Sequence, residues 1–456
     1  MKKEMFGHEI RILRDTFRRL LRRKARSNLI KLIEKTHPAD LAIVFRHLNG
    51  FEQSFLFSLM DENEQTAEFL GELDEAILAE ILEDIPPSRI AHIVRIASSN
   101  DQAFILNILP DEQSNAVIEL LHTEEREEIA EILAYPEDSA GSLMSTNVFT
   151  LHEDIDAGEA LSDLQNQSDA EMVFYLYIAD NDDRLVGVIS LRDLATTPPR
   201  TKLKDFMIKN VQYVRPETDQ EEVAKIVSQY NLLAVPVVDN DNHILGIVTV
   251  DDVVDVIREE ATEDFLQMAG VGKDREILMK SSWGNAKSRI PWLFASFIGG
   301  VCAISVIGYF SDMLETIIAL TAFIPIIIGM GGNIGTQSST IIVRGLATGR
   351  VDIGSDLKLI LKEVSVGVIL GILYGILLGF LTLFVFKDAP SNLGLVVGIS
   401  ICASMIIATS IGTIVPLLLR RLDIDPAIAT GPFVTTTIDI LGVTLYFVIA
   451  ALLLPI

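Results

Sequence analysis

Five long apolar segments in the C-terminal part of the chain constrain its fold more than any other feature. They cover about residues 290–310, 317–347, 359–386, 393–419 and 426–456. A helix needs about 20 mostly apolar residues to cross the hydrocarbon core of a bilayer. Because lipid offers the backbone no hydrogen-bond partners, such segments are expected to be helical. The sequence therefore predicts a transmembrane domain of five helices within residues 281–456.

Charge divides the chain at the same place. Residues 281–456 hold nine acidic and nine basic residues, so the whole net charge of −26 lies in residues 1–280. Residues 1–35 carry +8, which leaves −34 on residues 36–280. An acidic soluble part argues against a nucleic-acid partner and favours cations, although solubility alone explains such charge equally well.

Basic residues indicate how the segments are oriented. They precede the first segment and occupy the loops after the second and fourth segments, whereas the opposite loops hold one basic residue, Lys387. Cytoplasmic loops are enriched in Lys and Arg. We therefore expect a multi-pass protein of the inner cell membrane, with cytoplasmic N-terminal domains and an external C-terminus. No secretory signal is visible, and Cys302 and Cys402 lie in apolar segments, so no disulfide or thiolate metal site is expected.

Residues 1–139 are predicted to form an all-helical domain. Residues 1–35 have the pattern of a basic amphipathic helix, interpreted either as an arm on anionic lipid or, in preference, as the first helix of the following array. From residue 36 onward, short amphipathic helices begin with an acidic N-cap and end at Pro. Residues 74–87 resemble residues 101–112 at an offset of about 27, which suggests a repeating helical array.

Residues 140–257 contain two copies of one unit, at 140–200 and 201–257. Each copy is predicted to run strand, helix, strand, turn, strand, helix, and matched landmarks such as Gly187 and Gly246 recur in both. This pattern resembles a tandem pair of CBS domains, an α/β regulatory module. The resemblance implies that adenosine nucleotides or ions bind in the clefts between the halves.

Both copies carry a hydroxyl followed three residues later by a carboxylate, Ser190 with Asp193 and Thr249 with Asp252. In CBS modules this spacing can hold a ribose and its phosphate. The same spacing is also a common helix start, in which the hydroxyl caps the first turn. The residues alone leave the two interpretations equally open.

A strongly acidic helix is predicted to connect the second copy to the membrane domain over residues 251–280. At about 100° per residue, four carboxylates fall on one face of it: Asp252, Asp255, Glu259 and Glu263. The opposite stripe is apolar: Val253, Val254, Ile257, Ala261 and Phe265. Like charges at i and i+4 destabilise a helix by a few tenths of a kcal/mol per pair. A hard divalent cation such as Mg²⁺ or Ca²⁺ would supply the missing counter-charge, and the competing interpretation is a solvated acidic face.

One ionisable residue, Asp439, stands in the fifth segment, with 13 uncharged residues before it and 17 after it. A carboxylate near mid-bilayer costs several kcal/mol unless it is compensated. The second segment is interrupted by glycines and by polar residues such as Asn333. Such a segment is tolerated where it lines a water-filled path, and small residues also permit close helix packing. We therefore predict that the two segments form a cation path that includes Asp439.

Several motifs resemble the MgtE family of magnesium channels and transporters. They are PEDSAGSLM at 136–144, GGNIGTQ at 331–337 and DPAIATGPFVTTTIDILG at 425–442, together with the CBS pair and the acidic helix. The resemblance covers nearly the whole chain and implies a homodimer with its pore on the two-fold axis. It implies a multidomain fold of a helical N-terminal array, a CBS pair, a connecting plug helix and five transmembrane helices. The plug is expected to close the pore when cytoplasmic Mg²⁺ is high.

The resemblance also assigns roles to residues. Asp439 matches the acid that selects hydrated Mg²⁺, and Asp425 matches an acid at the cytoplasmic mouth of the pore. Further Mg²⁺-binding acids are expected on the plug and the second CBS copy: Asp252, Asp255, Glu260, Glu263, Asp219 and Glu221. The helix face alone favours Glu259 over Glu260, so both stay candidates. The expected pore-lining residues are Asn333, Gly431, Thr435 and Thr436. ATP is implied as a regulator, at Ser190, Arg192, Asp193 and Thr249.

Four positions depart from the family pattern: Ser88, His92 and Asn231 stand where acids of the sensor are expected, and Gly431 stands where a pore-lining amide can occur. The number of regulatory Mg²⁺ ions is therefore open, as is the choice between a channel and a coupled transporter. Two other functions also stay open: a transporter of another divalent cation such as Co²⁺ or Mn²⁺, and a membrane-anchored CBS nucleotide sensor without a pore. The sensor would have no use for Asp439. No nucleophile–base set, P-loop or thiolate zinc site is found, so an enzyme is not expected.

Overall fold

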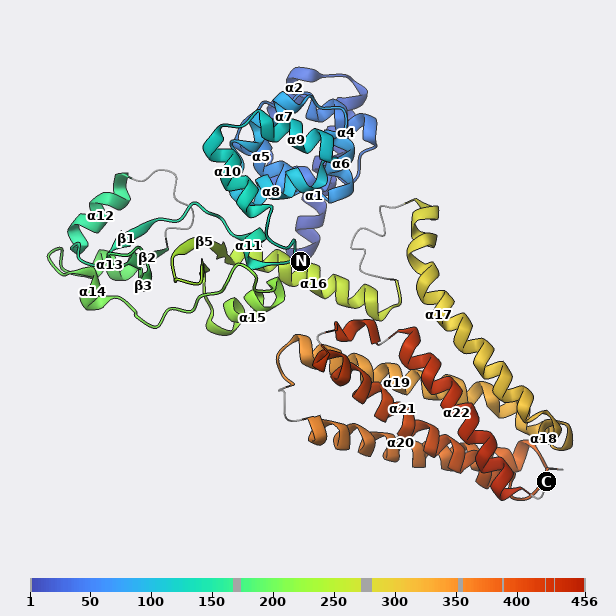
Figure 1. Cartoon of the computed structure of the whole chain (residues 1–456). Helices are drawn as coiled ribbons and strands as arrows, with labels where there is room; N and C mark the ends of the chain where they lie inside the picture. Colours follow the sequence, from blue (N-terminus) through green and yellow to red (C-terminus); the bar gives the residue numbers. More distant parts are fainter. Residues whose placement is uncertain are drawn as a thin grey trace. The chain divides into compact units, whose positions relative to one another are not determined.

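The computed structural model describes residues 2–166, 174–271, 281–351, 356–387, 389–422, 424–429 and 431–454 (Figure 1). The chain forms two compact units, Met1–Ile257 and Arg258–Ile456. Residues 272–280 of the predicted connecting helix lie outside the described residues.

The first unit begins with an array of short helices. They are α1 (Lys2–Arg22), α2 (Arg26–Ile33), α3 (Pro38–Phe45), α4 (Gly50–Phe57), α5 (Glu64–Gly71), α6 (Glu75–Leu82), α7 (Pro87–Val94), α8 (Ser99–Ile108), α9 (Asp111–Glu119) and α10 (Thr123–Ile132). Phe17 and Leu21 of α1 are buried in the same apolar core as Phe45 and Phe69. Helix α1 is therefore the first helix of the array, and its arginines lie outside this core.

A repeated hydrogen-bond pattern fixes how these helices stack. Gln65, Arg89 and Gln113 lie 24 residues apart at or near the start of α5, α7 and α9. Each side chain donates to two carbonyls near the end of an earlier helix, as Gln113 does to Leu82 O at 3.0 Å and Ile85 O at 3.2 Å. These donors satisfy carbonyl groups that a helix C-terminus leaves unpaired. The contacts repeat every 24 residues, so the offset of about 27 taken from the sequence is too long.

Two small sheets follow in the same unit. Strands β1 (Thr150–His152), β2 (Tyr175–Ala179) and β3 (Leu185–Ser190) form one sheet, with β1 parallel and β3 antiparallel to β2. Strands β4 (Ala234–Val238) and β5 (Ile244–Thr249) form an antiparallel pair. The accompanying helices are α11 (Ala140–Leu143), α12 (Ala157–Asn166), α13 (Leu191–Thr196), α14 (Leu203–Phe206) and α15 (Gln220–Tyr230). Strand β4 is buried along its length and rich in Val, which suits a buried strand.

Single backbone bridges interlock the two copies. Ser145, which precedes the strands of the first copy, pairs with Ile247 of β5 in the second copy. Ile208, which precedes the strands of the second copy, pairs with Val188 of β3 in the first copy. Each copy thus adds a bridge to the sheet of the other. The predicted tandem α/β pair is confirmed.

Helix α16 (Val250–Met268) begins in the first unit and ends in the second. Val253 is buried in the core of the second CBS copy, as the predicted apolar stripe requires. However, Val254, Ile257 and Phe265 expose 50%, 47% and 68% of their surfaces. The predicted stripe is therefore wrong beyond Val253.

The buried line of α16 contains polar residues instead. Val256, Glu263 and Gln267 are buried, and Gln267 Nε2 donates to Glu263 Oε1 at 2.8 Å. This hydrogen bond satisfies part of the polar surface that burial removes from water. A prediction from hydropathy misses such a buried face, because it places every acidic residue on the solvent-exposed face of the helix.

The second unit contains five helices that are long and apolar enough to cross a membrane. They are α17 (Ser282–Tyr309), α19 (Ile324–Ala347), α20 (Asp356–Val385), α21 (Leu393–Arg421) and α22 (Pro432–Leu453). The short elements α18 (Ser311–Thr316), η1 (Ile318–Phe323) and η2 (Pro426–Ala429) connect them. The prediction of a five-helix membrane domain is confirmed within the residues that the structure describes.

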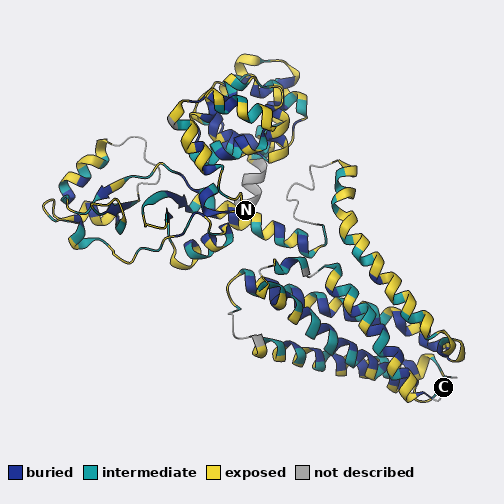
Figure 2. Cartoon of the chain, viewed as in Figure 1, coloured by how far each residue is buried: buried dark blue, intermediate teal, exposed yellow. Residues whose placement is uncertain are grey.

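Small residues set how closely α20 and α21 pack. A Cβ added at Gly375 would lie 2.6 Å from Gly398 O, and one added at Gly394 would lie 2.7 Å from Gly379 O. The two backbones therefore touch where any side chain would collide, as is common in membrane bundles. Figure 2 shows that much of α21 is buried, whereas α17 is exposed along most of its length. Helix α21 is thus the central helix of the unit.

Candidate functional site

Asp439 lies on α22, which begins at Pro432, a residue favoured in the first turn because its missing N–H would be unpaired there. Its side chain is half-buried. Helix α19 passes close to the carboxylate, because a Cβ added at Gly332 would lie 3.8 Å from Asp439 Oδ1. Within the described part of the chain, Asp439 makes no hydrogen bond or ion pair. An uncompensated carboxylate in a membrane helix is suited to meet a cation.

The other predicted pore residues lie on the same two helices or at their ends. Asn333 follows Gly332 on α19 and is exposed. Thr435 lies one turn before Asp439, and its hydroxyl donates to Pro432 O at 3.3 Å. The methyl carbon of Thr436 packs against Gly299 of α17. Thr436 is therefore placed at a helix contact, whereas Asn333 is open to its surroundings.

The end of α16 meets the start of α22. Gly270 has a φ of +72°, a conformation that glycine adopts readily, and a Cβ there would lie 3.3 Å from Pro432 Cδ. A Cβ added at Gly431 would in turn lie 3.6 Å from Gly270 Cα. Glycine at both positions lets the two chain segments approach. The acidic helix is thus in contact with the first turn of the helix that carries Asp439.

Four further acids lie near this contact in the sequence. Asp425 caps η2, because its Oδ1 accepts from Ala427 N at 2.8 Å. On α16, Glu260 is half-buried on the same side as the buried Glu263, and Glu259 is exposed. The two candidates that the sequence left open thus have different surroundings.

Asp252 joins segments that are far apart in the sequence. Its Oδ2 accepts from the backbone N–H of Thr249 at 3.2 Å and from the Thr249 hydroxyl, and its Oδ1 accepts from Asn100 Nδ2 at 2.8 Å. Burial raises the pKa of this carboxyl from 3.8 to about 6, against the lowering effect of the Thr249 hydrogen bonds. A cation that used both oxygens would have to displace Asn100 or Thr249.

The acids of the second CBS copy have local partners. Asp219 is the N-cap of α15, where its Oδ1 accepts from Glu221 N at 2.8 Å. Glu221 Oε1 pairs with Lys225 Nζ at 2.9 Å, an exposed pair of the kind worth at most about 1 kcal/mol. Asp255 is exposed on α16. These three carboxylates are therefore accessible to cations from solvent.

The predicted nucleotide-binding hydroxyls act as helix caps. Ser190 Oγ accepts from Asp193 N at 3.1 Å and donates to Asp193 Oδ2 at 2.7 Å, at the start of α13. At the start of α16 the Thr249 hydroxyl likewise donates to Asp252 Oδ2, but here the same carboxylate oxygen also accepts from the backbone N–H of Thr249, at 3.2 Å. Arg192 is exposed beside the first cap. The helix-start interpretation is thus observed, and nucleotide binding stays a prediction.

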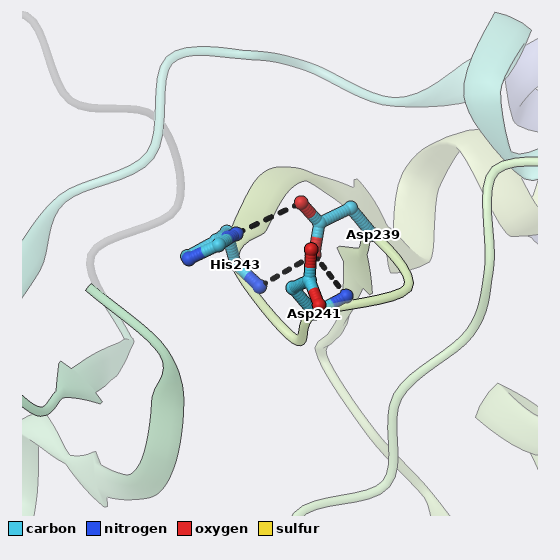
Figure 3. A group of neighbouring side chains, drawn as sticks. All are labelled: Asp239, Asp241 and His243. Atoms are coloured by element: carbon cyan, nitrogen blue, oxygen red, sulfur yellow. Dashed lines mark hydrogen bonds and ion pairs between the residues drawn. The ribbon is translucent and has the colours of Figure 1, made fainter. Parts of the chain in front are cut away.

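One cluster was not singled out in the sequence. Asp239, Asp241 and His243 surround the β4–β5 turn, and one ligand atom from each lies within 4.8 Å of the others (Figure 3). Asp239 Oδ1 accepts from Asp241 N and His243 N at 2.9 and 2.8 Å, and Asp239 Oδ2 accepts from His243 Nδ1 at 2.9 Å. His243 Nε2 lies 3.1 Å from Asp182 O of the first CBS copy.

Hydrogen bonding explains this cluster better than a metal does. A carbonyl oxygen can only accept, and an ionised carboxylate also accepts, so both ring nitrogens of His243 act as donors. The imidazole is therefore positively charged in this arrangement. The contact with Asp239 raises the pKa of His243 and lowers the pKa of Asp239. We interpret the cluster as a charged link between the two CBS copies.

Comparison with known proteins follows the same division of the chain. The family described as a divalent cation transporter matches residues 324–449, the MgtE intracellular N domain matches residues 36–138, and CBS domains match residues 140–198 and 203–259. Magnesium transporter MgtE of Thermus thermophilus is 38% identical over 340 residues, which is 74% of each chain. The chain belongs to the MgtE family. Magnesium transporter MgtE of Bacillus subtilis is 34% identical over 92% of each chain.

Solved structures agree for the soluble part of this MgtE member. The cytosolic domain of the Mg²⁺ channel MgtE in complex with ATP is 35% identical, covers 53% of this chain and 99% of that chain, and superposes with a TM-score of 0.51. The soluble part of a magnesium transporter is 31% identical, covers 55% of this chain and 99% of that chain, and has a TM-score of 0.50. The predicted family and fold class are confirmed. The relatives are transporters, so this is a membrane transport protein with an intracellular N-terminal domain.

Two features of the structure were missed in the sequence, a contact that has no local signal and a buried acid whose signal was overlooked. Asn100 and Asp252 are 152 residues apart, and an amide carries no signal of its own. Glu363 on α20 is a buried acid in the membrane unit, with 7% of its surface exposed. Its position inside the third apolar segment was the available signal, but the adjacent Lys362 made it resemble the charged edge of that segment.

Proposed function

We propose that this protein is a Mg²⁺ channel or transporter of the inner cell membrane that closes when cytoplasmic Mg²⁺ rises. The observation that carries the proposal is Asp439, a half-buried carboxylate on a membrane helix, beside Gly332 and without an internal partner among the described residues. Such a charge is costly unless a cation compensates it. Membership of a divalent cation transporter family supports the same conclusion.

Selection is proposed to act on the hydrated ion. Mg²⁺ loses its water reluctantly and favours oxygen ligands, so Asp439 would hold it through water. In a homodimer, two Asp439 carboxylates would face one axis, with Asn333, Gly431, Thr435 and Thr436 along the path. Helix α17 is largely exposed in the single chain, which leaves apolar surface for lipid or for the second subunit. The C-terminus would lie outside the cell.

Closure is proposed to start at the acids of the soluble part. Repulsion among Asp252, Asp255, Glu259, Glu260, Glu263, Asp219 and Glu221 would favour the open form, and Mg²⁺ bound to them would favour the closed form. A ligand shifts such an equilibrium only by binding the two forms with different affinity. The contact of Gly270 with Pro432 supports a route from α16 to α22, and Asp425 lies one residue before η2, which leads into α22.

ATP is proposed as a second regulator at the CBS pair, near Ser190, Arg192, Asp193 and Thr249. The support is the related cytosolic domain that was solved in complex with ATP. The proposed division is 1–139 for the helical domain, 140–200 and 201–257 for the CBS copies, 251–280 for the plug and 281–456 for the membrane domain.

The experiment is Mg²⁺ influx into vesicles that contain the purified full-length chain, followed with a Mg²⁺-sensitive dye. The native chain should conduct, and Asp439→Ala should not. Thr444→Ala, farther along the same helix, is the matched control and should conduct normally. Conduction by Asp439→Ala at the native rate would refute the proposal. Influx measured against Co²⁺, Mn²⁺ and Ca²⁺ decides whether another divalent ion is the true substrate.

A further inference from the structure

Glu363 is a second acidic side chain, after Asp439, on a helix long and apolar enough to cross a membrane. It lies on α20 with 7% of its surface exposed, and its Oε2 accepts a hydrogen bond from Ser338 Oγ of α19 at 3.0 Å. No basic side chain pairs with it in the described ranges. Buried acids in membrane helices are rare and usually functional. Nothing in the proposed pathway above uses this residue.

The surroundings of Glu363 are too tightly packed to suit a bound ion. One turn earlier on α20, Leu359 packs against the cluster of Ile342 and Leu417. One turn later, a Cβ added at Gly367 would meet the Thr409 hydroxyl and would lie 3.1 Å from Met405 O of α21. That hydroxyl already donates to Met405 O and Ile406 O of its own helix. Mg²⁺ needs six oxygen ligands, several of them water, and the close approach of α20 to α21 at Gly367 leaves no space there for a hydrated ion. The arrangement is that of a hydrogen bond between packed helices.

Ser338 is held on the side of α19 that faces away from Asp439. Ser338 follows Gly332 by six residues, which at about 100° per residue places it about 120° from Gly332 around the helix. Gly332 lies beside Asp439 of α22, whereas a Cβ added at Gly412 of α21 would lie 3.2 Å from Ser338 Cβ. Rotation of α19 that broke the Ser338–Glu363 bond would therefore move Gly332 and Asn333 relative to Asp439.

No other side-chain hydrogen bond links α19 to α20 among the described residues. Ser339, the next residue on α19, is fully buried, and its hydroxyl has no partner in that part of the chain. The rotation of α19 is thus fixed by packing and by one polar contact. We infer that Glu363 is a positioning residue for the ion pathway, acting through Ser338 on α19 rather than by touching the ion. This inference rests on the proposed function of Asp439.

The test measures Mg²⁺ influx in vesicles for Glu363→Gln, Glu363→Ala, Ser338→Ala and the double variant Ser338→Ala/Glu363→Ala. The amide oxygen of Gln can still accept from Ser338, so Glu363→Gln should stay within about threefold of the native rate. Glu363→Ala and Ser338→Ala remove one partner of a buried hydrogen bond and should each lose about tenfold. The double variant should be no worse than the worse single variant, because both changes break the same contact.

A role in positioning should also alter discrimination between ions, which loss of stability alone would not do. The ratio of Mg²⁺ to Ca²⁺ influx should fall in Ser338→Ala and stay native in Glu363→Gln. Detergent-solubilised variants are first compared with the native chain in thermal unfolding. If Glu363→Ala does not fold, Glu363→Gln and Ser338→Ala decide the matter.

Two results would overturn the inference. A folded Glu363→Gln that has lost transport would show that the charge itself is needed, as for a cation site. Native influx and native ion selectivity in Ser338→Ala would show that the hydrogen bond positions nothing. Asp439→Ala is run beside these variants. If the proposed function is wrong, Asp439→Ala transports Mg²⁺. If only the inference about Glu363 is wrong, Asp439→Ala still fails to transport Mg²⁺.

Discussion

Asp439 in the membrane unit and Asp252 in the soluble unit are both partly withdrawn from water, yet they have opposite surroundings. Asp252 accepts hydrogen bonds from Thr249 and from Asn100, whereas Asp439 has no partner of either kind among the described residues. A carboxylate that accepts hydrogen bonds from other segments mainly holds those segments together. A carboxylate without hydrogen-bond donors can bind a mobile cation. Burial of an acid therefore does not identify an ion site unless its hydrogen bonds are counted.

The largest expected effect is on conduction. Asp439→Asn keeps the shape of the side chain but removes its charge, so Mg²⁺ influx at saturating Mg²⁺ should fall by about 100-fold, equivalent to about 2.7 kcal/mol at the barrier. Asp425→Asn, which alters a cap of η2, should reduce influx less. Equal losses in the two variants would remove the distinction between the ion site and its surroundings.

The next effect concerns closure. Replacing Asp252, Asp255 and Glu263 together by Ala should leave influx that no longer falls as Mg²⁺ on the cytoplasmic face rises, because the acids whose repulsion is neutralised are gone. Patch recording or vesicle influx across a Mg²⁺ series checks this. Unchanged closure in the triple variant would mean that these acids have only a structural role, and that other residues sense cytoplasmic Mg²⁺.

A smaller effect, on stability, is expected from the hydrogen bond between Asn100 and Asp252. Asn100→Ala leaves Asp252 Oδ1 without its amide donor and should lower the stability of the soluble part by about 1–3 kcal/mol. Thermal unfolding of the full-length chain without Mg²⁺ measures this. Asn107→Ala, at the other end of the same helix, is the control and should change stability by no more than about 0.5 kcal/mol. Equal losses of stability in the two variants would show that the Asn100–Asp252 hydrogen bond makes no specific contribution.

The smallest effect is the pH dependence of the link at His243. The folded pKa of His243 is raised by Asp239, so its contribution to stability is complete below the unfolded value of 6.5 and is lost as pH rises through the folded pKa. The native chain should therefore lose slightly more stability above neutral pH than His243→Gln does. Parallel pH profiles of the two proteins would show that the charged link contributes nothing.

Much of the fold followed from local pattern. The five spans follow from apolar length, and the CBS pair follows from two copies with matched glycines at Gly187 and Gly246. The face of α16 did not follow, because Gln267 donates a hydrogen bond to Glu263 and both occupy a buried line that hydropathy assigns to apolar residues. The helical period alone gives the angle between side chains around the helix. It does not show which face of the helix packs against the rest of the protein.

The candidate site was predictable only where one residue carries the signal. Asp439 stands out because nothing near it in the sequence is charged. The Asn100–Asp252 contact depends on how the helical array packs against the CBS pair, and the Ser338–Glu363 contact depends on how α19 packs against α20. Neither spacing, at 152 and 25 residues, is a local pattern.

Mg²⁺ influx through Asp439→Asn and Asp252→Asn, measured in one vesicle preparation while Mg²⁺ on the cytoplasmic face is varied, tests the central claim most directly. We predict that influx through Asp439→Asn stays about 100-fold below the native rate at every cytoplasmic Mg²⁺ concentration. Asp252→Asn should conduct and close less completely as that concentration rises. Native conduction through Asp439→Asn, or loss of all conduction in Asp252→Asn despite normal folding, would contradict it.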